Sequence, residues 1–392
     1  MWNLYARWLE TLPSFFRTFV AMKNIAIIGA GSAGLFAAKL LSNYEDVRVT
    51  LFEKAKNPGT KLRASGGGKA NILNTNIKGD DYNNHRFMSA FLQRTDFQTI
   101  YNEFSRMGLR MTVDEENRVY PATLFSKTVL DVLLSNLSTR VTFRCECPVK
   151  KLVQRDGKWF VNDFPEAYDF VLMASGSPAN MIAANRKGLD DYLLPLQLAR
   201  KPFAPSLVGF KIKDYPKELY GCRAKAEVSL WQGSTLVWKE RGEVMFKEDG
   251  VSGIVVMNIS SHYNRLKNKN QCRLSFNFLY DDEKFDVKAH LAQYHDLAGV
   301  LHPKLNKLYQ RKPFDLRDFS LTIESLYDME FAQVCAGGIS VDEVNDTFEL
   351  KKYPGLYAVG EMLDIDGVCG GYNLFFAFAS AYEAVKAMTH GD

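Results

Sequence analysis

One segment near the start of this 392-residue chain constrains its fold more than any other. Residues 24–28 form an apolar run typical of a buried strand, and the chain continues directly into Gly29, Ala30, Gly31, Ser32, Ala33 and Gly34. In this pattern the first glycine permits a tight turn, the second lets a phosphate approach the backbone, and the third lets a helix pack on the strand. The segment therefore predicts a strand, a glycine turn and a helix over 32–42, whose N-terminus binds the phosphates of a dinucleotide.

An acidic residue follows at the distance that a dinucleotide-binding unit needs. The second expected strand, 48–53, ends in Glu53, which lies 19 residues after Gly34 and is followed by Lys54. A carboxylate at this place accepts hydrogen bonds from ribose hydroxyls, whereas an arginine would indicate a 2′-phosphate. The acid therefore favours FAD or NAD over NADP. The alternative, a glycine turn in an unrelated α/β protein, is less favoured because strand, spacing and acid occur together.

A second signal lies near the C-terminus. A short apolar strand at 355–359 is followed by Gly360 and Glu361, then by Asp366-Gly367, and then by Gly370, Gly371, Tyr372, Asn373 and Leu374. A helix is expected from Asn373 to Met388, and its positive N-terminal end would stabilise negative charge on a reduced flavin ring. The two ends of the chain together predict that both fold back to hold one flavin dinucleotide.

Two further glycine-containing segments have the composition of cofactor loops. The first is the loop at 61–71, which contains Lys61, Arg63, Ser65, Gly66, Gly67 and Asn71. Three consecutive glycines are unfavourable unless the backbone adopts left-handed angles or touches a ligand closely, although a flexible surface loop is the alternative. The second is Ala174, Ser175 and Gly176, the small-residue turn after an expected buried strand that begins at 170. We expect both segments to approach the dinucleotide.

The middle of the chain has a different pattern. From about residue 202 short alternating runs indicate a β-rich domain, either a barrel or a sandwich, with strands expected at 206–212, 223–231, 235–246, 253–259 and 273–280. Residues 284–310 have a helical apolar stripe, and earlier helices are expected over 86–107 and over 126–136 with Ser126 as the N-cap.

Net charge and cysteine spacing argue against several classes of protein. Lys and Arg number 49 against 45 Asp and Glu, so the net charge of +4 gives little support for nucleic acid as a partner. The six cysteines form no CxxC or CxxxxC pair, and no metal is expected from Cys145 and Cys147 or from His290, His295 and His302. A cytoplasmic location is the expectation, with no membrane-spanning segment. Residues 1–21 are expected to be a leader that is either non-native or a genuine amphipathic addition.

These motifs resemble the aminoacetone-oxidase/BaiN-like family of FAD-binding flavoproteins. The matching blocks cover almost everything after Met22, and they lie at 27–34, 61–74, 119–121, 174–176, 242–260, 336–340 and 354–377. The resemblance implies an α/β fold in which a discontinuous Rossmann-like FAD-binding domain carries an inserted β-barrel-like domain with a small helical insertion. The expected limits are 22–200 and 336–392 for the FAD-binding domain, 201–283 and 311–335 for the barrel, and 284–310 for the helical insertion.

The resemblance also implies roles for individual residues. Glu53 is expected at the adenosine ribose, Val149 beside the adenine, and Gly66, Gly67 and Asn71 near the flavin. Along the ribityl chain and the ring the expected residues are Glu361, Asp364, Gly371 and Asn373. One departure is Ala70, where the family usually has a cysteine in this loop, so any role of that thiol is absent here. The expected non-covalent FAD contacts are Gly29, Ala30, Gly31, Ser32, Ala33, Gly34, Glu53, Lys54, Lys61, Arg63, Ser65, Gly66, Gly67, Asn71, Val149, Ala174, Ser175, Gly176, Gly360, Glu361, Asp364, Gly371, Tyr372, Asn373 and Leu374.

The leading functional hypothesis is an FAD-dependent oxidoreductase. The flavin would be reduced by NAD(P)H and would pass hydride or electrons to an unidentified small organic acceptor. No second strand-GxGxxG-helix unit is present in the sequence, so a nicotinamide donor would dock only transiently. Two alternatives stay open: an oxidase of a small amine that uses oxygen, and a flavin-binding RNA-modifying or non-redox protein. Arg63, Tyr120 and Asn373 are the candidate catalytic side chains, and the oligomeric state is left open.

Overall fold

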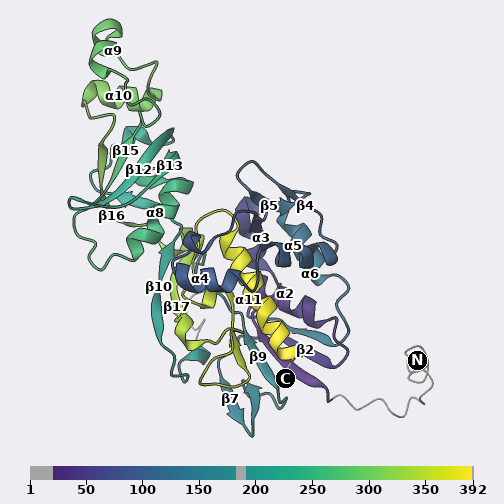
Figure 1. The fold of residues 1–392 in the computed structure, drawn as a ribbon. Helices are drawn as coiled ribbons and strands as arrows, with labels where there is room; N and C mark the ends of the chain where they lie inside the picture. The colour runs from purple at the N-terminus through teal and green to yellow at the C-terminus, as the bar shows by residue number, and fades with distance from the viewer. Residues whose placement is uncertain (1–20, 182–190, 391–392) are drawn as a thin grey trace.

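The computed structural model describes residues 21–181 and 191–390. Figure 1 shows two bodies, an α/β part that contains the C-terminal helix α11 and an elongated part that holds a barrel and ends in α9 and α10. The expected leader falls almost wholly on residues 1–20, outside the described residues. In the described ranges, no helix is long and apolar enough to cross a membrane.

The α/β part is built on a five-stranded parallel sheet. Its strands follow the order β18-β9-β1-β2-β6, with bounds β18 Leu356–Ala358, β9 Phe170–Met173, β1 Lys23–Ile28, β2 Val47–Phe52 and β6 Val141–Arg144. Ile28 pairs with both Phe52 and Met173, and Ala358 also pairs with Met173. The strands are short apolar runs because both faces of the sheet are covered. Strand β18, at one edge of the sheet, comes from the C-terminal part of the chain, which confirms the predicted discontinuous Rossmann-like fold.

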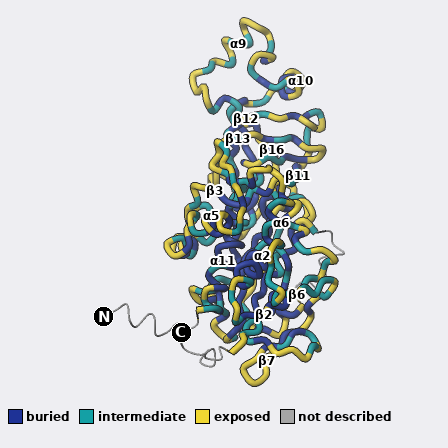
Figure 2. The backbone as a smooth tube through the Cα atoms, turned by 90° about the vertical axis from the view of Figure 1, so that its right-hand side faces the viewer, coloured by how far each residue is buried: buried dark blue, intermediate teal, exposed yellow. Residues whose placement is uncertain are grey.

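Two helices from opposite ends of the chain pack together on this sheet. They are α2 (Ser32–Leu41) and α11 (Tyr372–Thr389), and Figure 2 shows both as largely buried. Phe36 of α2 lies 5.2 Å from Phe378 of α11 between ring centroids, and 5.1 Å from Phe104 of α5 (Phe97–Arg106). This aromatic cluster holds the two ends of the chain in one core.

The second body is a closed six-stranded antiparallel barrel. Its order is β11-β14-β13-β12-β15-β16, with bounds β11 Phe210–Ile212, β14 Gly250–Ser252, β13 Thr235–Phe246, β12 Arg223–Gln232, β15 Cys272–Asn277 and β16 Phe319–Leu326. Alternate residues such as Val228, Leu230 and Phe276 fill a core in which they are fully buried. This confirms the predicted barrel-like insertion, whereas the exact domain limits stay a prediction.

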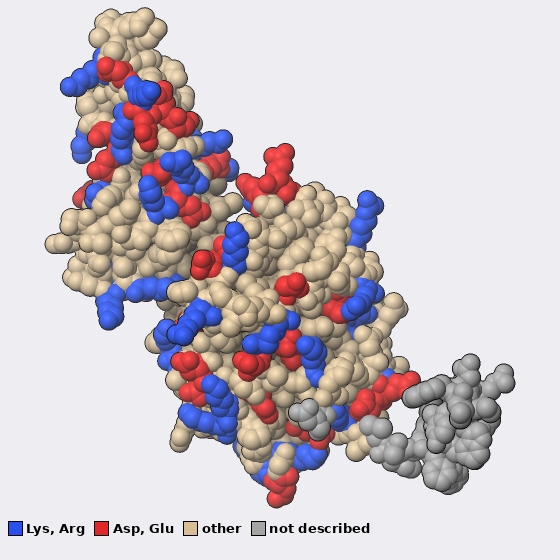
Figure 3. Space-filling view, in the orientation of Figure 1, with Lys and Arg blue, Asp and Glu red and all other residues tan. Residues whose placement is uncertain are grey.

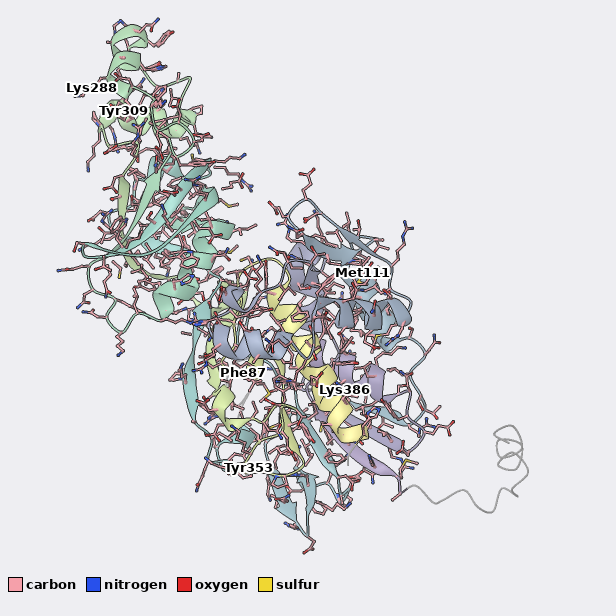
Figure 4. The ribbon with its side chains drawn as sticks, viewed as in Figure 1. Phe87, Met111, Lys288, Tyr309, Tyr353 and Lys386 are labelled. Atoms are coloured by element: carbon pink, nitrogen blue, oxygen red, sulfur yellow. The ribbon has the colours of Figure 1, made fainter. Side chains whose placement is uncertain are left out.

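A two-stranded ribbon connects the bodies. Strand β10 (Arg200–Ser206) pairs antiparallel with β17 (Val334–Ile339), and Figure 1 shows both running from the α/β part toward the barrel. The tip helices α9 (Val287–Tyr294) and α10 (Pro303–Arg311) lie at the far end of the barrel. Figure 4 places Lys288 and Tyr309 of these helices far from Phe87, Met111 and Lys386 of the α/β part. The tip is therefore remote from the sheet edge described below.

The remaining elements complete the α/β part. They are α3 Thr60–Ala64, α4 His85–Leu92, α6 Ser126–Leu134, β3 Leu73–Asn74, β4 Met111–Val113, β5 Arg118–Pro121, β7 Leu152–Arg155, β8 Lys158–Val161 and short 3₁₀ turns that include Ser65–Gly68. Strands β3, β5 and β4 form a small sheet, and β7 with β8 forms a hairpin.

The structure corrects the expected strand at 253–259. The chain there forms helix α8 (Ile254–Asn264), because Gly253 has a φ of +108° and ends the preceding strand. Burial follows a helical period, with Val255, Ile259 and Tyr263 packed on the barrel. The β-branched residues favoured a strand, and tertiary packing on the barrel overrode that propensity.

Other helix boundaries also differ from expectation. The segment 86–107 forms two helices, because Asp96 caps α5 by accepting a hydrogen bond from the Thr99 N–H at 2.9 Å. The segment 284–310 is also interrupted, since His295 is left-handed with a φ of +63°. Ser126 is not an N-cap: it is the first residue of α6, and its hydroxyl donates to the Arg63 carbonyl at 2.6 Å.

Candidate functional site

The carboxyl ends of the parallel strands meet at one edge of the sheet. Gly29 follows β1 with a φ of +103°, and its N–H donates to the Phe52 carbonyl at 2.8 Å. A β-carbon on Gly34 would lie 1.9 Å from the Gly29 carbonyl oxygen, so only glycine lets α2 pack against the turn. A β-carbon on Gly31 would meet nothing within 4 Å. The predicted glycine turn is thus present, and the space beside its second glycine is open.

The N-terminus of α2 faces a glycine from the other end of the chain. Gly31 is the N-cap and gives no side-chain hydrogen bond to the first turn, which begins at Ser32. A β-carbon on Gly360 would lie 3.4 Å from the β-carbon of Ala33. Because the first N–H groups of a helix need partners and carry partial positive charge, this junction suits an anion.

Glu53 is fixed by two backbone groups at the same edge. Its carboxylate accepts hydrogen bonds from the N–H of Ala30 at 2.7 Å and of Ala55 at 2.8 Å. Burial lowers the pKa of the neighbouring Lys54, an effect partly offset by the Glu53 carboxylate. A cavity of about 60 Å³ lies here, lined by Ile28, Gly29, Phe52, Glu53, Lys54, Cys147, Pro148, Val149, Ser175 and Tyr192. Glu53 and Val149 are therefore brought together, although 96 residues separate them in the chain.

The glycine loop lies against the start of α11. Gly66, Gly67 and Gly68 all have left-handed φ angles of +56°, +63° and +88°, which glycine adopts without strain. In the amide orientation that satisfies both groups, Asn71 accepts from the Gly371 N–H at 3.2 Å and donates to the Leu73 carbonyl at 3.0 Å. The loop and the C-terminal glycines thus form one backbone-lined surface.

An ion pair links the glycine loop to the segment after β18. Lys61 Nζ lies 2.9 Å from Glu361 Oε2 and also donates to the Ser177 carbonyl at 3.3 Å. The other carboxylate oxygen of Glu361 accepts from the Cys335 N–H at 3.3 Å. Burial and, secondarily, the Glu361 carboxylate raise the pKa of the Cys335 thiol to about 12.

Asp364 anchors the same segment to the connecting ribbon. Its Oδ2 lies 2.7 Å from Lys201 Nζ, and its Oδ1 accepts from the Gly337 N–H at 3.2 Å. A cavity of about 420 Å³ opens next to this ribbon. Its lining residues are Ser175, Gly176, Leu193, Leu198, Arg200, Lys201, Pro202, Phe203, Gly338, Ile339 and Met362. Ser175 also borders the smaller cavity, and its hydroxyl lies 2.8 Å from that of Tyr192.

A buried polar cluster around Asp366 was not among the expected site residues. Asp366 is 1 % exposed and pairs with Arg265, the residue that follows α8, while Ser206 and Ser261 donate to it at 2.9 and 3.1 Å. Burial raises the pKa of Asp366, and the Arg265 guanidinium opposes that shift. The Asp366-Gly367 pair was visible in the sequence, but nothing there indicated its partners in the barrel.

The three candidate catalytic side chains do not form one group. Arg63 is exposed on α3, and Tyr120 is half-buried on β5, where burial raises its pKa. The amide of Asn373 accepts from the Gly367 N–H and donates to the Gly367 carbonyl, both at 2.9 Å. The Asn373 side chain therefore stabilises the loop between Gly367 and the start of α11. Among the described residues, no group of three or more His, Cys, Asp or Glu side chains is placed to hold a metal.

The remaining expected residues border the same loops. Ser65 donates its hydroxyl to the Leu62 carbonyl at 2.7 Å, and Tyr372 is nearly buried, with its carbonyl accepting from the Tyr82 hydroxyl at 2.8 Å. Leu374 packs partly buried against the core of the α/β part. Ala174 is 6 % exposed, and its N–H donates to the Ile28 carbonyl at 2.8 Å.

Comparison with known proteins adds the family context. The model of the HI0933-like protein Rossmann domain matches residues 23–387. A 3-dehydro-bile acid delta(4,6)-reductase of Clostridium scindens is 28 % identical, covering 93 % of this chain and 99 % of its own length. A ribosomal RNA dihydrouridine synthase of Escherichia coli is 27 % identical, covering 92 % and 96 %. The open conformation of a flavocytochrome c3 fumarate reductase has 13 % identity and a TM-score of 0.43, covering 99 % of this chain and 81 % of its own.

Proposed function

This chain belongs to the HI0933-like family of FAD-binding Rossmann proteins and is an FAD-dependent oxidoreductase, and we propose that it is a reductase, which takes electrons from NAD(P)H and saturates a carbon–carbon double bond in a small acceptor. The observation that carries this proposal is the sheet edge where both ends of the chain meet. There, a β-carbon on Gly31 would meet nothing within 4 Å, Gly29 and Glu53 line a cavity, and Gly360 packs against Ala33.

The residues at this edge fit FAD. The empty side of Gly31 and the N-terminus of α2 would take the pyrophosphate. Glu53 and Val149 line a cavity that would take the adenosine end, since each Glu53 carboxylate oxygen accepts one backbone N–H group and still has a lone pair for a ribose hydroxyl. Gly66, Gly67 and Gly371 present bare backbone, and there we place the flavin ring. The other expected FAD contacts are proposed with them.

FAD, when bound, supplies hydride chemistry, and the chain supplies orientation and electrostatics. The N-terminal end of α11 begins at Tyr372, directly after two glycines, so its partial positive charge would stabilise negative charge on the reduced ring. The Lys61–Glu361 and Lys201–Asp364 pairs hold the segments on either side. The electron donor would dock transiently.

The relatives support an acceptor class. The names 3-dehydro-bile acid delta(4,6)-reductase and dihydrouridine synthase both describe the saturation of a C=C bond that is conjugated with a carbonyl group. We extend that shared chemistry to this chain. The expectation that nucleic acid is not a partner gains no support from these names, because two relatives are named for ribosomal RNA. A uracil base is therefore the second candidate acceptor.

The test is an anaerobic titration of the purified holoenzyme with NADH and, separately, with NADPH, followed through the visible absorbance of the flavin. We expect one of the two to bleach the flavin stoichiometrically. If neither bleaches a flavin that dithionite still reduces, the nicotinamide-fed reductase is refuted. The amine-oxidase alternative or the non-redox alternative would then take its place.

A further inference from the structure

A polar cluster outside the proposed FAD contacts joins the barrel to the flavin loop. Asn258 of α8 donates to Glu240 Oε1 of β13 at 2.8 Å, and its own carbonyl oxygen accepts from the Cys369 N–H at 2.8 Å. Cys369 directly precedes Gly370 and Gly371, whose φ angles are +124° and +99° and which lie directly before α11. Glu240 is thus connected through one buried side chain to the loop where we place the flavin ring.

Apolar side chains surround this cluster on the surface. Trp238 stacks on His262, with ring centroids 3.9 Å apart and planes at 14°, yet it is 39 % exposed. Leu236 and Ile254 are also exposed, at 42 % and 47 %. Helix α8 carries no Lys, Arg, Asp or Glu, and Figure 3 shows few charged side chains over it. Exposed apolar and aromatic side chains therefore flank a partly exposed carboxyl on this face.

Burial shifts the pKa values of the titratable side chains in this cluster toward their neutral forms. Burial raises the pKa of Glu240, and the hydrogen bonds from Asn258 and Trp238 offset this only in part. Burial raises the pKa of the Cys369 thiol to about 12, with the Glu240 charge contributing. His262, which faces the same space from α8, has a pKa lowered to about 4 by burial and by Arg265, so it is neutral near pH 7. Cys369 and His262, the other two titratable side chains of this cluster, are therefore both neutral near pH 7.

We propose that this surface, formed by Leu236, Trp238, Glu240, Ile254, Asn258 and Cys369, is the acceptor site, and that Glu240 is the acid that protonates the acceptor. The proposal rests on the function proposed above and names its substrate class: a flat, uncharged molecule with a carbonyl-conjugated C=C bond. Trp238 would stack on its plane. The uncharged surface excludes acceptors that carry carboxylates or phosphates next to the reacting bond.

The step balances as follows. The acceptor loses its C=C π bond and gains two C–H bonds, one at the carbon β to the carbonyl through a hydride from the reduced flavin and one at the α carbon through the proton of Glu240. Glu240 becomes a carboxylate and recovers its proton from water. FAD, when bound, would supply the hydride, and NAD(P)H would supply the two electrons that it carries.

The experiment uses dithionite-reduced holoenzyme, so that its result does not depend on the nicotinamide donor. Two probes are mixed with it anaerobically, 2-cyclohexen-1-one and testosterone, a 4-en-3-one steroid, and flavin reoxidation is timed. We expect Glu240→Gln to slow reoxidation by about 10²- to 10⁴-fold, the usual contribution of a general acid, and Glu240→Asp to restore part of it. The matched control is Glu243→Gln on the same strand, where the carboxylate is exposed and pairs with Arg223 at 3.0 Å. We expect the control to react like the wild type.

A second readout does not involve turnover. Binding of each probe to the oxidised holoenzyme is followed through perturbation of the flavin spectrum, and we expect Trp238→Ala to weaken it about tenfold, the low end for loss of an aromatic stack. Glu240→Gln should leave probe binding nearly unchanged. In the wild type, reoxidation should slow as the pH rises through the raised pKa of Glu240, because the acid form is lost.

Failure of the two proposals gives different results. If the wild type is reoxidised by a probe and Glu240→Gln is equally fast, Glu240 is not the acid, while the reductase stands. If Trp238→Ala binds the probes like the wild type, the acceptor lies elsewhere. If neither probe reoxidises the wild type, the double-bond reductase is refuted, and this acceptor site with it.

Discussion

The open side of Gly31 makes a sharp prediction about FAD binding. In most glycine turns a larger residue damages both the fold and the ligand site, so the two effects cannot be separated. Here Gly31 has a φ of −84° and a ψ of −163°, which any L-residue adopts, and a β-carbon would touch nothing within 4 Å. Gly31→Val should therefore leave the folded protein intact and fill the space that we assign to the pyrophosphate.

The magnitude follows from the groups at the N-terminus of α2. Displacing the pyrophosphate removes at least two hydrogen bonds to a charged group, each worth about 1.5–3 kcal/mol. The loss of about 3 kcal/mol or more raises the Kd for FAD by about 100-fold or more. The free energy of unfolding of the apoprotein should change by less than about 1 kcal/mol, since Gly31 lies in unstrained backbone without a close neighbour.

Two companion variants test the reasoning. In Gly34→Ala the new β-carbon would lie 1.9 Å from the Gly29 carbonyl oxygen, so we expect the apoprotein itself to be destabilised, by about 1–3 kcal/mol or more. Gly299→Val is the matched control: Gly299 is also open within 4 Å but lies between the tip helices.

The assays are thermal unfolding of deflavinated protein and fluorescence titration with FAD. Wild-type FAD affinity in Gly31→Val would refute the pyrophosphate assignment. A large loss of apoprotein stability in that variant would show that the space beside Gly31 is not open in solution.

Two other substitutions address the adenosine end and the acid stability of the barrel. Glu53→Gln should weaken FAD binding about tenfold through loss of a charged acceptor, and Glu53→Arg should weaken it at least about 100-fold. The control Glu45→Arg, at an exposed turn, should leave FAD binding unchanged. If FAD titrations of the Glu53 variants match the wild type, the ribose role of Glu53 is refuted. Burial lowers the pKa of His262 from 6.5 to about 4. As the pH falls, His262 is therefore protonated in the unfolded chain before it is protonated in the folded protein. The free energy of unfolding should decrease by about 3 kcal/mol between pH 6.5 and 4. In denaturant unfolding, the free energy of unfolding should decrease less steeply with falling pH in His262→Asn than in the wild type, and the exposed His295→Asn should behave like the wild type. If His262→Asn and the wild type have identical pH profiles, the burial of His262 is contradicted.

Local patterns were sufficient for the elements that need only their neighbours in the chain. The Gly29–Gly34 turn, the acid at the end of β2 and the parallel strands follow from residues within one strand-turn-helix unit. The alternation over 223–246 was sufficient to predict strands of a β-rich domain, either a barrel or a sandwich. The wrong predictions came from relying on local propensity. The β-branched residues of α8 favoured a strand, but they pack on the barrel as a helix. The cap at Asp96 was missed, although its partner, the Thr99 N–H, lies only one turn away.

The predicted FAD contacts illustrate the same division. Glycine-rich loops and the acid could be identified from spacing, because their chemistry requires particular residues at fixed intervals. That Asn71 meets Gly371, and that Lys61 meets Glu361, required the fold, since each pair joins segments about 300 residues apart. The role of Asn373 could not be anticipated for the same reason: its amide closes its own loop.

The sequence by itself determined the class of fold and the cofactor, because glycine spacing, strand hydrophobicity and an acid at the correct distance are local requirements of dinucleotide binding. Only the tertiary structure decided how the barrel meets the C-terminal loop. The Asp366–Arg265 pair and the Asn258 bridge from Glu240 to Cys369 each join the barrel to the C-terminal loop. Their geometry depends on how the barrel packs against the α/β part, and the spacing of residues along the chain does not encode that packing.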